Sequence, residues 1–155
     1  MIVIKYKDMK RKADLEKFLE AQEKDYSIAL AEIKNGRKQS HWIWYIFPQI
    51  AGLGFSGTSA FYAIEDLQHA SDYLQHPVLG SRLIEVSRSI LGIEGKTARQ
   101  ILGSPDDLKL RSSMTLFSLA DQSDPVFAAV LDKYFEGKPD PKTIALLKEQ
   151  KSNYL

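Results

Sequence analysis

A short basic segment contains the residues whose types and spacing best fit chemistry with an anion. Arg37 and Lys38 are followed closely by Ser40 and His41. If Ser40 caps a helix, the free backbone N–H groups of the first turn and the helix dipole attract anions. Arg37 and His41 can then donate hydrogen bonds to a phosphate or carboxylate, with His41 as an orienting donor or a proton carrier. The structural alternative is an ordinary pair of helix ends, in which the cations complement one dipole and Ser40 caps the next helix.

The segment that follows is uncharged and rich in aromatic residues. Residues 39–64 contain no Asp, Glu, Lys or Arg, although these types make up 26% of the chain. Both tryptophans and five further aromatic residues lie within it. Because burial requires such a composition, we expect this segment in the core. The alternative is a pocket, in which Trp44 and Tyr62 form apolar walls and Gln49 supplies a polar group from a loop of small residues.

Three glycines in that loop match a dinucleotide-binding fingerprint. Gly52, Gly54 and Gly57 have the spacing G-x-G-x-x-G. The mechanism of this motif requires a strand before it, a helix after it and an acid about 20 residues further on. Pro48 interrupts the candidate strand, and Asp72 lies in a helical pattern. We therefore interpret the glycines as turn residues with positive φ and predict no cofactor.

Two further groups of residues invite chemical interpretations that their spacing does not support. Lys109 and Ser113 suggest a Ser–Lys nucleophile, but nothing in the sequence brings the lysine within reach of a serine or supplies an oxyanion hole. His69 and His76 are seven residues apart and lack a third ligand at metal spacing, so we predict no metal site. These residues leave open whether the protein is an enzyme.

The composition excludes several functional classes. The 155 residues carry a net charge of +1, which gives no overall field to hold nucleic acid or an anionic membrane. The chain has no Cys, which excludes disulfides, thiolate zinc sites and a cysteine nucleophile. The apolar run Ile2–Ile4 is too short for a secretory signal, and no apolar run is long enough to span a membrane. We therefore expect a cytoplasmic protein without nucleic-acid or membrane partners, and the sequence does not indicate its oligomeric state.

Helices must position these residues, because apolar residues recur at helical spacing over most of the chain after residue 12. We predict an all-α fold: a compact single domain over residues 13–150, with about six to eight helices, after an N-terminal extension over residues 1–12. Ile2–Tyr6 has a β-favouring composition and forms at most a short extended segment. The dipeptides typical of helix ends or starts are Asn35-Gly36, His76-Pro77, Ser104-Pro105, Asp124-Pro125 and Asp140-Pro141.

The helix expected to start with Ser104 as its N-cap links the two polar regions. A charge-free aromatic segment needs amphipathic neighbours, and Leu110, Met114 and Phe117 form an apolar stripe at helical spacing. We expect this helix to pack beside residues 42–47. That packing brings Lys109 or Ser113 close to the basic segment and joins the two polar regions into one site.

Several runs of sequence together resemble a bacterial family catalogued as domain of unknown function 1810. The resemblance covers roughly residues 13–148 and implies a compact, largely α-helical domain of bacterial origin, without an established reaction. Some similar sequences carry the label calpastatin, but calpastatin-type inhibitors are disordered and this chain has the composition of a packed globule. The runs are FLEAQ (18–22), GRKQSHWIWYIFPQIAGLGFS (36–56), YLQHPVLGSRL (73–83), DDLKLRSSMTLF (106–117) and VLDKYFEG (130–137).

Two functional hypotheses follow. The first is a site for a small anionic ligand that bears a phosphate or carboxylate. A nucleotide-like ligand is one form of this hypothesis. The family-like pattern includes polar types that an apolar core does not require, which favours such a site. The second hypothesis is a protein–protein interaction module without catalytic activity. The candidate ligand-binding residues are Arg37, Lys38, Ser40, His41, Trp44, Gln49, Tyr62, Lys109 and Ser113.

Overall fold

Helices form almost all of the regular structure. The computed structural model describes the backbone of residues 2–153 and the side chains of residues 14–152. Within this range there are nine helices and no strand, apart from an isolated bridge between Ile50 and Ile64. The all-α prediction is confirmed, with more helices than the six to eight expected. In chain order they are α1 (Ile2–Lys34), α2 (Ile43–Ile46), α3 (Gly57–Phe61), α4 (Leu67–Gln75), α5 (Leu79–Leu91), α6 (Ala98–Leu102), α7 (Asp106–Leu119), α8 (Pro125–Phe135) and α9 (Pro141–Asn153).

Three helices of four or five residues account for the higher number. α2, α3 and α6 are too short for apolar residues to repeat along one face. Two of them have capped starts: Ser59 N–H donates to Ser56 Oγ at 3.1 Å in α3, and Gln100 N–H donates to Thr97 Oγ1 at 3.1 Å in α6. Local capping, rather than an amphipathic pattern, therefore marks α3 and α6.

The N-terminal segment is helical rather than extended. α1 begins at Ile2, so the predicted extended segment Ile2–Tyr6 belongs to a helix. A lone extended segment leaves its backbone N–H and C=O groups unpaired, and the described chain offers no strand with which it could pair. A helix pairs these groups internally. Neither α1 nor any other helix in the described range is both long enough and apolar enough to cross a membrane.

Several predicted helix boundaries are confirmed. Gly36 has a φ of +77° just beyond the end of α1. At the start of α8, Asp124 Oδ1 accepts a hydrogen bond from Val126 N–H at 2.8 Å. In the first turn of α9, Asp140 Oδ2 accepts one from Thr143 N–H at 3.0 Å.

Two predicted N-caps are wrong. The N-cap position of α7 is occupied by Pro105 instead of Ser104, and no side chain caps this helix. Ser40 does not cap α2, whose N-cap residue is Trp42. The Ser40 hydroxyl donates instead to the carboxylate of Glu32, because a charged acceptor makes a stronger hydrogen bond than a neutral one.

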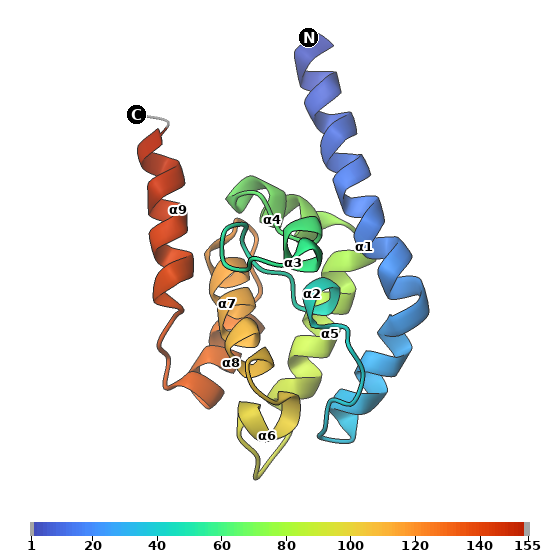
Figure 1. Ribbon diagram of the computed structural model, residues 1–155, viewed down its shortest axis with the longest axis vertical. Coiled ribbons are helices and arrows are strands. Elements are labelled where there is room, and N and C mark those ends of the chain that lie inside the picture. Colours follow the sequence, from blue (N-terminus) through green and yellow to red (C-terminus); the bar gives the residue numbers. More distant parts are fainter. Residues whose placement is uncertain (1, 154–155) are drawn as a thin grey trace.

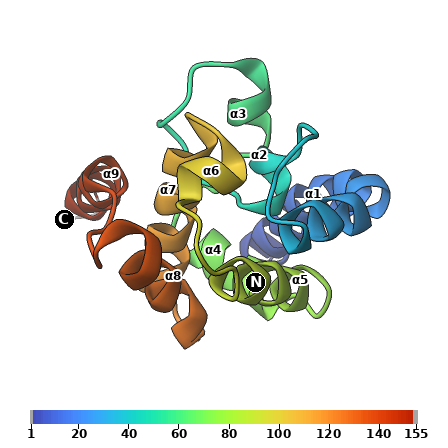
Figure 2. The same ribbon diagram turned by 90° about the horizontal axis from the view of Figure 1, so that it is seen from below.

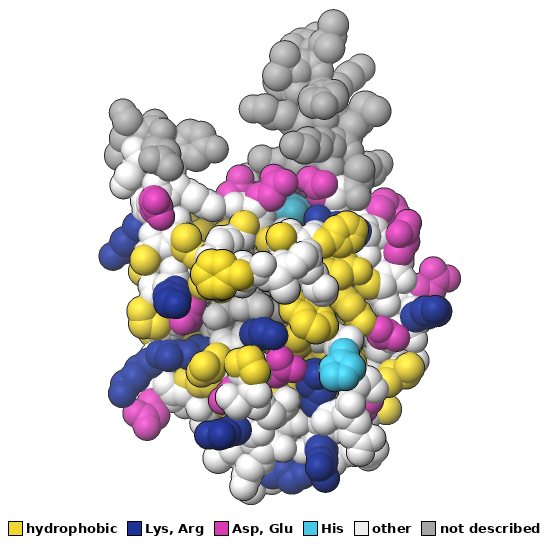
Figure 3. All heavy atoms as spheres, in the orientation of Figure 1, with side chains coloured by type: hydrophobic (Ala, Val, Ile, Leu, Met, Phe, Trp, Pro, Cys, Tyr) yellow, Lys and Arg dark blue, Asp and Glu magenta, His cyan; other side chains and the backbone are white. Residues whose placement is uncertain are grey.

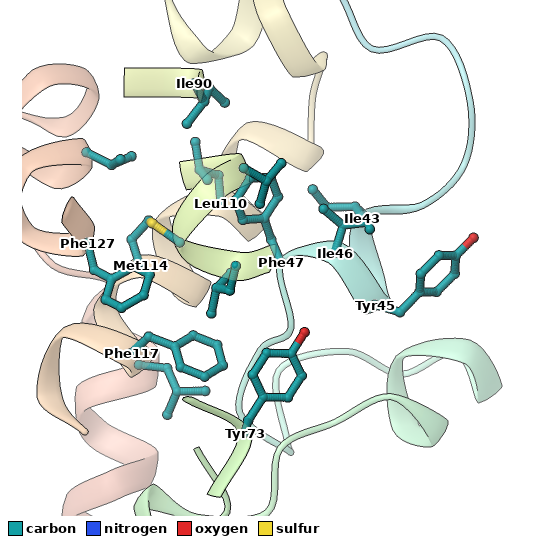
Figure 4. Close-up of a cluster of buried hydrophobic side chains, with 14 of the residues drawn as sticks. Ile43, Tyr45, Ile46, Phe47, Tyr73, Ile90, Leu110, Met114, Phe117 and Phe127 are labelled. Atoms are coloured by element: carbon teal, nitrogen blue, oxygen red, sulfur yellow. The ribbon is translucent and has the colours of Figure 1, made fainter. Parts of the chain in front are cut away.

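α7 is the central helix of the domain (Figures 1 and 2). It packs against α2, α4, α6, α8 and α9, while α5 packs against α1, α4 and α8. The predicted packing of α7 beside residues 42–47 is confirmed. Phe47, Tyr73, Phe117 and Phe127 are fully buried in the core around α7 (Figure 4). Lys109 on the same helix is only partly buried, so α7 also presents a polar side chain beside α2.

The three glycines of the apparent dinucleotide fingerprint have other structural roles. No strand precedes them in the described chain, and the helix that starts at Gly57 has only five residues. Gly52 has a φ of +100°, whereas Gly54 and Gly57 have ordinary φ values, so positive φ was correctly predicted for one of the three. A Cβ atom at Gly54 would lie 2.4 Å from Ser59 Oγ, so this glycine allows the loop to approach α3 closely.

Candidate functional site

Glu32, near the end of α1, binds the basic segment from within the protein. Its Oε1 accepts hydrogen bonds from Gln39 N–H (2.8 Å), Ser40 N–H (2.9 Å) and Trp42 Nε1–H (2.8 Å). Its Oε2 accepts a fourth from the Ser40 hydroxyl at 2.6 Å. Partial burial raises the pKa of the Glu32 carboxyl, but the hydrogen bonds outweigh it and lower this pKa to about 2. The group is therefore a carboxylate at any ordinary pH.

This carboxylate takes the position that the sequence suggested for an anionic ligand. The N–H and O–H groups of Ser40 both donate to Glu32 and are not free for a ligand. Arg37 and His41 are exposed and line neither of the two hollows described below. The structure does not gather Arg37, Ser40 and His41 into one site.

Asp106, in the first turn of α7, joins two lysine–tryptophan pairs. Its Oδ2 lies 2.9 Å from Lys38 Nζ, and its Oδ1 lies 3.3 Å from Lys109 Nζ. Lys38 Nζ lies 5.2 Å from the ring centre of Trp42, and Lys109 Nζ lies 5.0 Å from that of Trp44, which are both cation–π distances. The prediction that α7 brings Lys109 close to the basic segment is confirmed through Asp106. The Lys38 side chain is only 8% exposed, so its ammonium group contacts Asp106 and Trp42 rather than solvent.

Two adjoining hollows lie between the loop after α2, α3, α7 and the start of α9. The smaller one, which we call the inner hollow, has a volume of about 150 Å³. The larger one, which we call the outer groove, has a volume of about 940 Å³. The inner hollow is lined by Trp44, Gln49, Ile50, Ala51, Gly52, Leu53, Gly54, Ser59, Ala60, Tyr62 and Ala63. The outer groove is lined by Trp44, Gln49, Leu53, Gly54, Phe55, Ser56, Ser59, Pro105, Leu108, Lys109, Arg111, Ser112, Asp140, Pro141 and Lys142.

Trp44 and Gln49 line both hollows, so the two form one continuous surface. On the face drawn in Figure 3, apolar side chains lie around the middle of the molecule with Lys and Arg side chains among them. Of the candidates named from the sequence, Trp44, Gln49 and Lys109 line the outer groove, and Tyr62 lines the inner hollow. Ser113 is fully buried on α7, so the proposed union of Arg37 and Ser113 in one ligand site does not form.

Two side chains that line both hollows carry hydrogen-bond donors. The Trp44 indole N–H and the Gln49 side-chain amide make no hydrogen bond to another described residue. Both side chains are half-buried. By contrast, the indole N–H of Trp42 is fully used by Glu32. The donors of Trp44 and Gln49 are therefore available to a ligand that enters the hollows.

The outer groove has an excess of positive charge. Lys109, Arg111 and Lys142 line it, against the single carboxylate of Asp140. Arg111 Nε and Nη2 donate to the carbonyl oxygens of Lys138 (2.9 Å) and Pro139 (3.0 Å), so its guanidinium is fixed in place beside the groove. Because these carbonyl groups carry no net charge, they do not neutralise the positive charge of Arg111.

Sequence reasoning missed Arg111 and Lys142. Lys142 follows the helix start at Asp140-Pro141, which was recognised, but nothing in the sequence shows that α9 begins beside residues 49–56. Asp140 itself accepts hydrogen bonds from Ser112 and Thr143, so its carboxylate serves the start of α9. Only the tertiary packing reveals that Arg111 and Lys142 line the outer groove.

Tyr62 contributes a ring rather than a hydroxyl donor. Its ring centre lies 5.1 Å from that of Tyr45 and 5.7 Å from that of Phe18. Burial raises the pKa of the Tyr62 hydroxyl, and the negative charges of Glu20 and Asp25 raise it further. A hydroxyl near two carboxylates is a poor contact for an anion, so Tyr62 serves as part of the wall.

The histidines of the described chain do not line the two hollows. His69 is buried at the start of α4, where its Nδ1 accepts a hydrogen bond from Glu65 N–H, and burial lowers its pKa. No group of three or more potential metal ligands occurs among the residues that the structure describes.

Comparison with known proteins places the chain in a family. The model of a family described as protein of unknown function (DUF1810) matches residues 12–147, and the chain belongs to this family. A solved structure with a similar fold is that of the conserved hypothetical protein Rv1873 from Mycobacterium tuberculosis. It is 44% identical in sequence, with a TM-score of 0.85, over 87% of this chain and 96% of the other. Among curated proteins, none matches the chain.

Proposed function

We propose that the outer groove and the inner hollow bind a small anionic ligand that carries a phosphate or carboxylate. The observation that carries this proposal is that Trp44 and Gln49 line both hollows and that their side-chain N–H groups bond to no other described residue. Lys109 lies over the Trp44 ring at 5.0 Å and supplies a positive charge at the same place.

Electrostatics supports an anion over a cation or a neutral ligand. Lys109, Arg111 and Lys142 outnumber Asp140 among the groove-lining charges. Asp106 compensates part of the Lys109 charge, but Lys142 forms no ion pair with any described residue. A partly dehydrated groove also strengthens a charge-assisted hydrogen bond relative to one in bulk water.

The test is titration calorimetry with inorganic phosphate, simple phosphate esters and small carboxylates. Replacement of Lys109 or Lys142 by Met removes one charge from the groove and keeps most of the side-chain volume. Each replacement is expected to weaken anion binding about ten- to a hundredfold, since a hydrogen bond to a charged group contributes about 1.5–3 kcal/mol. Arg37→Met is the matched control, because it removes the same charge from an exposed side chain outside the groove.

The control separates this site from the basic segment. If Arg37→Met weakens binding as much as Lys109→Met, the ligand binds at the basic segment or responds only to the total charge, and the groove assignment is wrong. Thermal unfolding of each variant checks that Lys109→Met, which also loses its contact with Asp106, remains folded.

A second candidate function, protein–protein interaction without catalysis, is favoured by the rim of the outer groove. Phe55 is fully exposed and Leu108 is 53% exposed there. A partner that uses this rim should be retained from cell lysate at a stoichiometric level by the unaltered protein. It should be lost from the variants Phe55→Ser and Leu108→Ser, whereas anion binding through Lys142 should persist.

A further inference from the structure

The inner hollow has the size of a single flat ring. Its volume of about 150 Å³ equals that of a cavity that holds one benzene molecule. Trp44 and Tyr62 supply aromatic walls, and Leu53, Ala60 and Ala63 supply smaller apolar ones. Aromatic walls favour offset-stacked or edge-on contact with another ring.

Glycines keep one side of the hollow open. Gly52 and Gly54 line it with backbone alone. At Gly54 a side chain would collide with Ser59, and at Gly52 the φ of +100° disfavours any other residue. Backbone without side chains therefore forms this side of the hollow.

Gln49 adds a polar contact at the edge of this space. Its amide carries both donors and an acceptor, and it makes no hydrogen bond to another described residue. A ring with a nitrogen or a polar substituent would pair with such an amide, whereas a saturated hydrocarbon would leave it unpaired.

Charge is segregated from the inner hollow. No charged residue lines it, and Lys109, Arg111 and Lys142 line only the outer groove. Inorganic phosphate would use the cations and leave the aromatic walls without a contact. A ligand that satisfies both parts has an apolar ring at one end and a negative charge at the other.

We infer that the ligand is a small aromatic or heteroaromatic acid or phosphate ester, whose single ring enters the inner hollow while its anionic group lies in the outer groove. This inference rests on the anion-binding function proposed above and names its ligand class.

The test compares ligands of equal charge that differ in the ring. Calorimetry measures the affinities of phenyl phosphate against methyl phosphate, and of benzoate against cyclohexanecarboxylate. The aromatic member of each pair is expected to bind about tenfold more tightly, because only it places a flat apolar ring in the hollow. Phenyl phosphate should also change the fluorescence of Trp44, and this change should be absent from Trp44→Phe, in which the fully buried Trp42 remains.

Ala60→Leu places extra side-chain volume in the hollow without altering a charge. This variant should bind phenyl phosphate no more tightly than methyl phosphate, with its methyl phosphate affinity within about twofold of the unaltered value. Thr58→Leu is the control, because Thr58 lies on the same helix and lines neither hollow. Should Ala60→Leu not fold, Gln49→Leu is used, and its expected effect is a selective loss for pyridine-3-carboxylate relative to benzoate.

The outcomes separate this inference from the proposed function. Equal affinity for phenyl and methyl phosphate in the unaltered protein overturns the ring-binding inference but leaves anion binding intact. A preference for the ring that survives Ala60→Leu also overturns it, because the ring then binds elsewhere. If none of the four compounds binds, anion binding at this site fails together with the inference.

Discussion

The single acidic residue Glu32 holds the conformation of the segment that the sequence suggested as an anion site. It lies in the last turn of α1, where the helix dipole disfavours a negative charge, and yet it accepts four hydrogen bonds from residues 39–42. An acid at such a position is therefore a signal of a specific tertiary contact. The carboxylate thus accepts the hydrogen bonds that an external anion would otherwise accept.

We predict that Glu32→Gln destabilises the protein by about 1–3 kcal/mol, since it weakens hydrogen bonds to a charged acceptor. The folded-state pKa of Glu32 is about 2, below its ordinary value of 4.5. The unfolded chain therefore takes up a proton first as the pH falls, and the stabilisation is lost progressively between pH 4.5 and 2. Urea unfolding at a series of pH values measures this. The difference between the two proteins should be largest above pH 4.5 and shrink towards pH 2.

Glu23→Gln provides the control, because Glu23 is an exposed acid on the same helix. It should change stability by less than about 0.5 kcal/mol. Equal effects of the two substitutions would show that the Glu32 hydrogen bonds contribute nothing specific.

At the same scale, the sequence identified part of the candidate site. Trp44, Gln49 and Lys109 were found because the uncharged aromatic segment and the polar side chain on α7 are visible as patterns. Ser40 was assigned to a ligand because its partner, Glu32, lies eight residues earlier on α1, and no local rule reveals that contact. Lys142 was missed for the same reason, since its place in the groove depends on how α9 meets α7.

At the scale of the helices, α4 and α5 meet at a corner. Gly80 allows their backbones to approach there more closely than at any other glycine of the described chain. A Cβ atom at Gly80 would lie 1.9 Å from the carbonyl oxygen of Leu74, and this oxygen belongs to the backbone of α4. α4 and α5 both pack on the central core, so neither helix can move apart without a loss of contacts.

We predict that Gly80→Ala lowers the free energy of unfolding by about 3 kcal/mol, because the added methyl group forces the two helices apart. Chemical denaturation measures the change. Gly57→Ala is the matched substitution at the start of α3, where a Cβ atom would meet nothing within 4 Å and φ is ordinary. It should change stability by no more than about 1 kcal/mol and in the stabilising direction. A Gly80→Ala protein as stable as Gly57→Ala would refute the close contact.

For the whole molecule, the fold class followed from the sequence more readily than the arrangement. Helical periodicity and the dipeptides at Asn35-Gly36, Asp124-Pro125 and Asp140-Pro141 are local signals, and the corresponding boundaries are confirmed. α3 and α6 were not expected, because helices this short have no periodic pattern. The hollows depend on contacts between helices that are distant in the chain, so they became visible only in three dimensions.

The extent of the folding unit gives the last prediction. The family model begins at residue 12, and the first fully buried side chain in the described range is Phe18, whose ring contacts Tyr73 edge-on with centres 5.2 Å apart. We predict that a chain shortened to residues 12–155 unfolds in a single transition within about 2 °C of the full chain. Calorimetry tests this. A chain shortened to residues 20–155 also loses Leu15 and Phe18, and since a buried aromatic side chain contributes about 3–5 kcal/mol, its midpoint should fall by roughly 10 °C or more. Equal losses in both shortened chains would show that residues 1–11 belong to the cooperative core, and that the boundary predicted near residue 12 is wrong.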